Sequence, residues 1–361
     1  MKKMFLIILV LAVLLSGCTA GEINRPVTAE EYIDSMTFSE KVAQMFIVHC
    51  PPSGAQDAVN EYHFGGYLLF ANHFKDETPE SIKEKIALYQ EFSKTPMFIA
   101  VDEEGGIVTR VSRYPSFRSK RFASPQDLYN EGGMERIAAD TKEKSELLLS
   151  LGINVNFAPV CDVATSPDAF IYSRTFGEDA AHTAEYVKTV VTQMKSSKIG
   201  SCLKHFPGYG DNADTHIGYA IDDRPYESFT ENDFLPFTAG IDAGAGMVMV
   251  SHNIVKCMDD NMPASLSEKV HEELRGLGFE GIIITDDLTM DAIKEFTGDE
   301  SAAVAAVKAG NDMLCCSNYE EQIDAVIKAV ENGEISEERI NESVKRILQY
   351  KEELGIFGFE N

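Results

Sequence analysis

Residues 281–286 have the sequence Gly-Ile-Ile-Ile-Thr-Asp, a β-branched run that ends in an acid. β-Branched residues favour strands, and a run without polar alternation is typical of a parallel strand covered by helices on both faces. The stretch therefore predicts a buried strand with a polar group at its carboxyl end. Seven further runs have the same character: Met45–Cys50, Gly66–Phe70, Met97–Asp102, Ile153–Val160, Ser201–Phe206, Met247–His252 and Asp312–Cys316.

Amphipathic helical patterns separate these runs. In residues 79–92, apolar side chains stand at Ile82, Ile86, Leu88 and Tyr89, which predicts an amphipathic helix. Eight strands separated by helices predict an α/β fold, namely a (β/α)8 TIM barrel. An open doubly wound sheet is the alternative, but no GxGxxG motif follows the first run. The other expected helices are Glu135–Leu151, Glu178–Met194, Glu231–Ala243, Leu266–Leu277, Glu300–Ala309, Tyr319–Glu331 and a last one from Ser336.

The N-terminus has the pattern of a secretory signal. A basic start precedes the apolar run Met4–Leu15, and about 12 residues are too few to span a bilayer. The run ends in Leu-Ser-Gly-Cys18, which resembles the lipobox of bacterial lipoproteins, where the Cys receives lipid. We expect a signal peptide over 1–17, a tether over 18–30 and one catalytic domain over 31–361. The product would be an extracytoplasmic lipoprotein of a bacterial cell envelope, anchored to the membrane through Cys18; an ordinary secretory signal is the alternative.

Charge and cysteine content limit the kinds of ligand that the protein is expected to bind. With 32 Lys and Arg against 58 Asp and Glu, the net charge of −26 argues against nucleic acid, because phosphate binding needs clustered cations. The chain has no CxxC pair and no HExxH motif, so no metal and no cofactor are expected. The remaining cysteines are expected to be buried free thiols: Cys50, Cys161, Cys202, Cys257, Cys315 and Cys316.

Titratable residues gather where the predicted strands end. In TIM barrels, the carboxyl ends of the strands carry the active site. The densest stretch, 204–216, begins at a strand end with Lys204-His205 and continues into a Gly-rich loop. The stretches 101–110 and 284–290 are similarly polar. Burying several charged groups together at the mouth of a barrel costs free energy, and such clusters are typical of functional sites. These three stretches therefore predict the active site.

Four motifs stand out: KHFPGYG (204–210) followed by DTH (214–216), ITDDLTM (284–290), VDEEGG (101–106) with Arg110, and NFAPVCDV (156–163) followed by Arg174-Thr-Phe-Gly. These motifs resemble glycoside hydrolase family 3, most closely its single-domain β-N-acetylhexosaminidase branch. The resemblance covers about residues 31–357. It implies retaining hydrolysis of terminal β-linked N-acetylglucosamine through a covalent glycosyl-Asp intermediate. The substrates would be cell-wall or chitin-type oligosaccharides, with a role such as peptidoglycan turnover.

The resemblance assigns roles residue by residue. Asp286 would be the nucleophile, while Asp287 is better explained as a helix cap. Asp214 and His216 are expected to form the acid/base pair. A carboxylate beside an imidazole favours its protonated form, which allows His216 to act as an acid near neutral pH. Asp211 is the alternative acid. The substrate-binding residues carried over are Asp102, Arg110, Arg174, Lys204 and His205.

Three departures from the family pattern leave the substrate open. Glu103 stands where Gln or His is frequent, Ile107 where Arg is frequent, and Tyr209 where His is frequent. Alternatives within the family are a phosphorylase and a β-glucosidase. Outside it, the chain could be an amino-sugar-binding lipoprotein without catalysis, or a lyase with a Schiff base on Lys204. A binder need not keep Asp286 together with the acid/base pair, which favours an enzyme.

Overall fold

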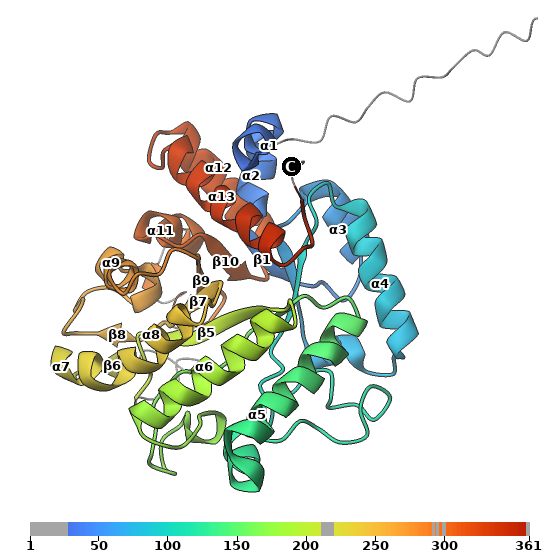
Figure 1. Ribbon diagram of the computed structural model, residues 1–361. Coiled ribbons are helices and arrows are strands. Elements are labelled where there is room, and N and C mark those ends of the chain that lie inside the picture. The colour runs from blue at the N-terminus through green and yellow to red at the C-terminus, as the bar shows by residue number, and fades with distance from the viewer. Residues whose placement is uncertain (1–27, 211–219, 291–292, 294–295, 298–300, 359–361) are drawn as a thin grey trace, which may run out of the picture.

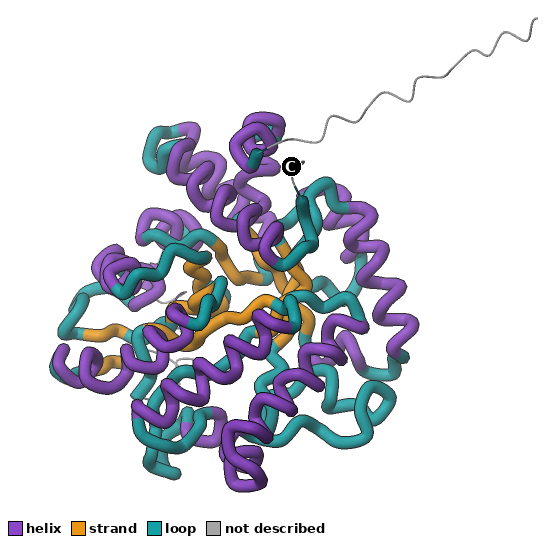
Figure 2. Tube along the Cα trace, in the orientation of Figure 1, coloured by secondary structure: helices purple, strands orange, loops and turns teal. Residues whose placement is uncertain are grey.

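The computed structural model describes residues 28–210, 220–290, 293, 296–297 and 301–358. Within these residues eight strands form one closed barrel, in the order β1-β10-β9-β7-β5-β4-β3-β2, with parallel pairing throughout. Figures 1 and 2 show the helices arranged around the strands. The predicted (β/α)8 TIM barrel is confirmed. The barrel strands are β1 (Phe46–His49), β2 (Gly66–Leu69), β3 (Phe98–Val101), β4 (Val155–Asn156), β5 (Gly200–Phe206), β7 (Met247–Val250), β9 (Ile282–Asp287) and β10 (Met313–Cys316).

Several helices begin at a polar residue whose side chain caps the first turn. Thr78 caps the N-terminus of α4, and Ser336 accepts the Arg339 N–H at 3.1 Å at the start of the last helix. The α-helices are α1 (Ala29–Ser35), α2 (Phe38–Gln44), α3 (Ala55–Tyr62), α4 (Pro79–Phe92), α5 (Pro125–Ser150), α6 (Ala180–Ser196), α7 (Tyr226–Ser228), α8 (Phe234–Asp242), α9 (Glu268–Gly276), α11 (Ala302–Ala309), α12 (Tyr319–Glu331) and α13 (Glu337–Glu353), and the shorter turns are η1 (Ala71–Phe74), η2 (Tyr172–Arg174), η4 (Phe229–Asp233) and η5 (Ala264–Leu266).

The fourth predicted strand is much shorter than the run 153–160. Pro159 has no N–H for the ladder, and side chains take over part of the pairing with β3. Asn154 accepts the Ile99 N–H at 2.8 Å, and Asn156 accepts the Glu103 N–H at 2.9 Å. The strand therefore shrinks to two residues, with an isolated bridge further on between Val160 and Lys204.

Other elements differ from expectation at the edges of the fold. Helices α1 to α3 were not predicted, and α1 begins at Ala29, inside the expected tether. Helix α5 begins ten residues before the predicted Glu135, because a kink at Gly132 and Gly133 joins it to a short helical segment that starts at Pro125. A small second sheet pairs β6 (Ile221–Asp222) with β8 (Ile254–Val255). These pieces are short, so their periodicity is weak.

Helix α13 closes the barrel at the end where the strands begin. The Tyr350 hydroxyl accepts the Ser201 N–H at 3.0 Å. Next to it, the fully buried Lys351 donates to Gln44 Oε1 at 2.7 Å, and its Nζ lies 5.0 Å from the centre of the Phe98 ring. Burial lowers the pKa of Lys351 to about 7. With this end filled, the mouth at the carboxyl ends of the strands is where a ligand can enter.

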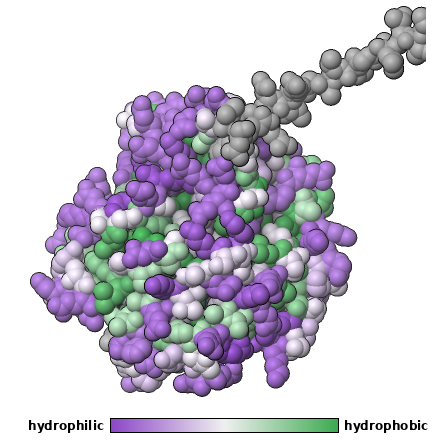
Figure 3. Space-filling view, viewed as in Figure 1, coloured by the Kyte–Doolittle hydropathy of each residue, from purple (hydrophilic) through white to green (hydrophobic). Residues whose placement is uncertain are grey.

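Figure 3 shows a largely hydrophilic face, with hydrophobic residues interspersed among the helices. Within the described part of the chain, no helix has the length and apolar character needed to cross a bilayer. The six cysteines beyond Cys18 are all free; five are buried as predicted, but Cys257 is exposed. Cys18, the signal segment and most of the tether lie outside the described residues.

Candidate active site

One cavity at the barrel mouth collects the predicted site residues. It is lined by Asp102 after β3, Lys204 and His205 on β5, and Asp286 on β9, together with Arg110 from a loop and Arg174 at the end of η2. These six residues come from four separate stretches of sequence. The structure thus brings together every predicted catalytic or substrate-binding residue that it describes. Asp214, His216 and the alternative acid Asp211 lie outside the described residues.

Glu103 shapes the loop that presents Arg110. The side chain is buried and accepts the backbone N–H groups of Arg110 and Val111, each at 2.7 Å. It also accepts the Ser112 hydroxyl in a short hydrogen bond. A carboxylate supplies the acceptor oxygens that these donors need, which explains why an acid fits this position. The Glu103 side chain therefore holds residues 110–112 of the loop in place and does not line the cavity.

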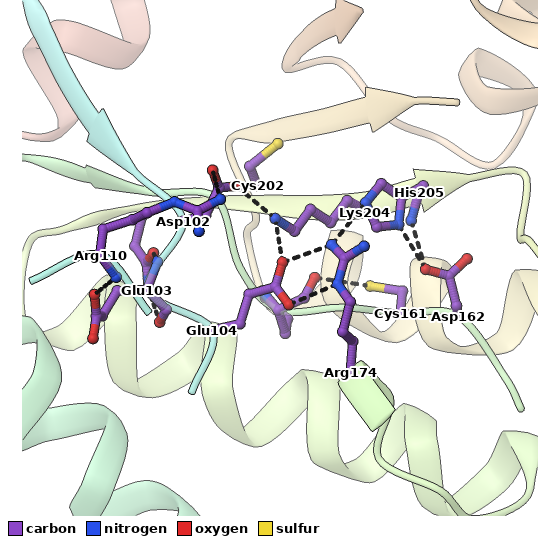
Figure 4. Close-up of polar contacts among 12 residues, drawn as sticks. Asp102, Glu103, Glu104, Arg110, Cys161, Asp162, Arg174, Cys202, Lys204 and His205 are labelled. Atoms are coloured by element: carbon purple, nitrogen blue, oxygen red, sulfur yellow. Dashed lines mark hydrogen bonds and ion pairs between the residues drawn. The ribbon is translucent and has the colours of Figure 1, made fainter. Parts of the chain in front are cut away.

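A network of ion pairs forms the floor of the cavity (Figure 4). Lys204 Nζ lies 2.8 Å from Asp102 Oδ1 and 2.7 Å from Glu104 Oε1. Arg110 Nη2 reaches Asp102 Oδ2 at 3.3 Å, and Arg174 binds Glu104 with two nitrogens. Two carboxylates are thus shared among three cations, which leaves donors and acceptors arranged for neighbouring hydroxyls of a sugar.

The network keeps its members charged. Burial disfavours the charged form of each group, but the opposite charges outweigh it. Lys204 and Arg110 hold the pKa of Asp102 below its usual value, and Arg174 and Lys204 do the same for Glu104. In return, the carboxylates raise the pKa values of Lys204 and Arg174. A fixed set of charges in a sheltered cavity can recognise hydroxyls without rearranging.

Glu104 and Asp162 were missed by the sequence reasoning. Glu104 stands two residues after Asp102, so alternation along an extended segment places both on one side, and this spacing could have revealed it. Asp162 holds His205: its Oδ2 lies 2.8 Å from His205 Nδ1, and its Oδ1 accepts the Tyr209 N–H at 2.8 Å. The other ring nitrogen of His205 lies 3.3 Å from Arg174 Nη2. Asp162 is thus the partner that orients His205 toward the cavity.

Asp286 and Asp287 have different surroundings at the end of β9. Both residues line the cavity, and one oxygen of Asp286 accepts the N–H of Asp287 at 2.8 Å. Asp287 accepts the Thr289 N–H at 2.9 Å and the Thr289 hydroxyl at 2.6 Å, so it caps the turn that follows. Residues 291 and 292, which follow this turn, lie outside the described residues, so the expected role of Asp287 as a helix cap stays a prediction. Its second oxygen lies 3.2 Å from His49 Nε2.

A second charge cluster lies against the glycine-rich loop after β5. The Arg224 guanidinium binds two buried carboxylates, Asp222 at 2.8 Å and Asp233 at 2.9 Å. A Cβ on Gly210 would lie 2.6 Å from Arg224 Cζ, and one on Gly208, whose φ is 124°, would collide with Asp233. These two glycines are therefore required by the packing of the cluster beneath the loop.

Comparisons with known proteins agree with this geometry. The family profile described as the glycosyl hydrolase family 3 N terminal domain matches residues 37–350. Beta-hexosaminidase A of Pseudoalteromonas piscicida is 29% identical over 333 residues, which cover 84% of this chain and 56% of that protein. Beta-hexosaminidase LpqI of Mycobacterium tuberculosis is 29% identical over 325 residues, covering 86% of this chain and 82% of LpqI.

A solved structure of a family 3 enzyme has a similar fold. A glycoside hydrolase family 3 beta-N-acetylglucosaminidase from Paenibacillus sp. str. FPU-7 superposes with a TM-score of 0.83 at 30% identity, over 90% of this chain and 64% of that chain. The chain thus spans less than two thirds of this structure and of the Pseudoalteromonas protein, but most of LpqI.

Proposed function

Because the chain belongs to glycosyl hydrolase family 3, we propose that it is a retaining β-N-acetylhexosaminidase that releases terminal β-linked N-acetylglucosamine. The observation that carries the proposal is the position of Asp286. Its carboxylate shares one cavity with the charged groups of Asp102, Lys204, Arg110, Arg174 and His205. The names of the relatives support the choice of amino sugar. The substrates would be cell-wall or chitin-type oligosaccharides, as in peptidoglycan turnover.

The proposed mechanism has two steps. In the first, Asp286 attacks the anomeric carbon and forms a glycosyl-Asp bond, while His216, paired with Asp214, gives a proton to the departing oxygen. In the second, His216 takes a proton from water, which attacks the same carbon and releases the sugar with its original configuration. The ion-paired floor binds the sugar hydroxyls, with Asp102 accepting and Lys204 donating.

We further propose that the protein is an extracytoplasmic lipoprotein. The support is the sequence pattern of residues 1–18, with a short apolar run that ends before Cys18. Lipid on Cys18 would hold the chain to a membrane of the cell envelope.

The test of function compares two chromogenic substrates, a nitrophenyl β-N-acetylglucosaminide and the matching β-glucoside, with and without phosphate. We expect turnover of the first alone, without need for phosphate, and NMR should show the β-anomer as the first product. Turnover that requires phosphate would establish a phosphorylase, and preference for the glucoside a β-glucosidase. Binding of N-acetylglucosamine without turnover of either substrate would establish a non-catalytic binding protein.

A further inference from the structure

Lys144 is a buried lysine on helix α5, and it belongs to none of the sequence motifs. Its Nζ donates to the backbone carbonyl oxygen of Glu104 at 2.9 Å. The same nitrogen lies 3.4 Å from Asp140 Oδ2 and 5.1 Å from the centre of the Phe122 ring. A lysine is rarely buried unless its charge is compensated and its hydrogens are bonded. Here Asp140 compensates the charge, and the hydrogen bond goes to the loop that follows β3.

The carbonyl group of Glu104 and the N–H of Gly105 belong to one planar peptide unit. The carbonyl oxygen accepts from Lys144, and the N–H donates to the Val108 carbonyl oxygen at 3.1 Å. Gly105 has a φ of 110°, in a region where glycine moves freely between conformations. The orientation of this peptide unit therefore depends on the two hydrogen bonds at its ends, and Lys144 supplies one of them.

Glu104 is also the residue that joins two cations of the cavity floor. Its Oε1 lies 2.7 Å from Lys204 Nζ and 2.7 Å from Arg174 Nη2. A rotation of the peptide unit after Glu104 changes the direction of its side chain, because both are attached to the same Cα. The carboxylate and the two cations that it binds would then move together.

We propose that Lys144 is a positioning residue for the sugar-binding floor. By fixing the peptide unit between Glu104 and Gly105, it fixes the Glu104 carboxylate, and through that carboxylate it fixes Lys204 and Arg174. This inference rests on the proposed function, in which the floor binds the hydroxyls of the sugar.

A positioning role and a purely structural role of Lys144 have different kinetic effects. The floor contacts the sugar hydroxyls in the bound substrate as well as in the transition state, so a misplaced floor raises KM and leaves kcat largely unchanged. A loss of folded protein reduces the number of active molecules. It therefore lowers the apparent kcat, while the remaining molecules keep their KM.

The experiment removes the hydrogen bond to Glu104 without leaving a buried charge alone. In Lys144→Met, the buried Asp140 carboxylate would keep the longer contact of 3.8 Å to Arg136, and such a broken buried pair destabilises the fold. We therefore compare Asp140→Asn with the double variant Asp140→Asn/Lys144→Met. Both lack the buried ion pair, but only the double variant lacks the donor to Glu104. Methionine fills a similar space without a donor.

We expect the double variant to raise KM for the nitrophenyl β-N-acetylglucosaminide by about 10-fold relative to Asp140→Asn. The Kd of N-acetylglucosamine, measured by calorimetry, should rise by the same factor. The kcat per active site, counted by titration with a fluoro-sugar inactivator, should stay largely unchanged. The control is Lys142→Met on the same helix, which removes an exposed pair with Glu146 and should keep the parental KM.

Amide hydrogen exchange tests the same idea without substrate. In a peptide that covers residues 101–110, exchange should be faster in the double variant than in Asp140→Asn, because the Gly105 N–H shares its peptide unit with the carbonyl that lost its donor. Equal exchange in the two variants, equal KM, or a loss confined to kcat would overturn the positioning role. A parent chain that neither turns over the substrate nor binds N-acetylglucosamine would refute the proposed function instead, and the exchange comparison would still decide whether Lys144 fixes the loop.

Discussion

Arg174 and Glu104 form a two-point ion pair, with Arg174 Nε 3.0 Å from Glu104 Oε2 and Arg174 Nη2 2.7 Å from Glu104 Oε1. A planar guanidinium held by both oxygens of a carboxylate is fixed in orientation as well as in distance. The same carboxylate also binds Lys204. Glu104 therefore sets the direction of two of the cations that face the cavity, although it was absent from the residues predicted from sequence.

Glu104→Gln should destabilise the fold, because it leaves two cations without their buried partner. We expect a loss of about 3–5 kcal/mol in the free energy of unfolding at pH 7, measured with urea. The lowered pKa of Glu104 means that its contribution is present above about pH 4.5 and fades as the pH falls below it. The parent and the variant should therefore converge in acid. The control is Glu334→Gln, which removes an exposed pair with Lys308 and should cost at most about 1 kcal/mol.

Asp286→Asn should lower kcat by at least about 1,000-fold, since the covalent route through the glycosyl-Asp bond is lost. Asp287→Asn should cost far less, because an amide oxygen can still accept from Thr289. Peptide mapping after reaction with a fluoro-sugar inactivator checks the assignment. A label found on a peptide without Asp286, or a product of inverted configuration, would contradict it.

His216→Ala should affect substrates according to their leaving group. A general acid contributes about 100- to 10,000-fold where the departing oxygen is a poor leaving group, so kcat/KM for a disaccharide should fall by that much. The value for a nitrophenyl sugar should fall much less. Asp214→Ala should weaken activity and lower the pH at which the acid form is lost. Near-parental cleavage of a disaccharide by the His216 variant would shift the role to another group, with Asp211 the first to test.

Asp233→Asn should change how stability depends on pH. Burial raises the pKa of Asp233 to about 7, despite Arg224 beside it. The folded state then keeps a proton that the unfolded chain releases above about pH 3.8, so this group makes the parent less stable as the pH rises from about 4 to 7. The asparagine variant lacks this decline. Its Tm relative to the parent should improve between pH 5 and pH 8, whereas the exposed Asp242→Asn on the neighbouring helix α8 should show no such trend.

Cys18→Ala should release the protein from membranes into the soluble fraction, because the proposed lipid anchor on Cys18 would be lost. Fractionation of cells followed by immunoblotting measures the change. The matched control is Cys257→Ala, which removes an exposed thiol of the folded domain and should leave the distribution as it was. Membrane association that persists in the Cys18 variant would contradict lipid anchoring at this residue.

The barrel could be predicted because each of its strands carries its own local pattern. The exception is the run 153–160, which forms a strand of only two residues. There the side chains of Asn154 and Asn156 accept the N–H groups of Ile99 and Glu103, where backbone pairing was expected, and a hydrophobic pattern does not reveal such bonds. The site was predicted only where a residue ends an apolar run or matches a family motif. Asp162 acts through His205, a partner distant in sequence, and such a pair becomes visible only when the strands are placed side by side.

The position of α1 has a practical consequence. The Tyr32 hydroxyl lies 2.9 Å from Thr95 Oγ1, just before β3 begins, and its ring lies 4.9 Å from the Phe357 ring. The chain therefore enters the folded domain at the pole where the strands start, opposite the cavity. A support attached through residue 18, whether a bilayer or a sensor chip, would lie on the side of the barrel where the strands start. The mouth would then face the surrounding medium, ready for glycan fragments that arrive by diffusion.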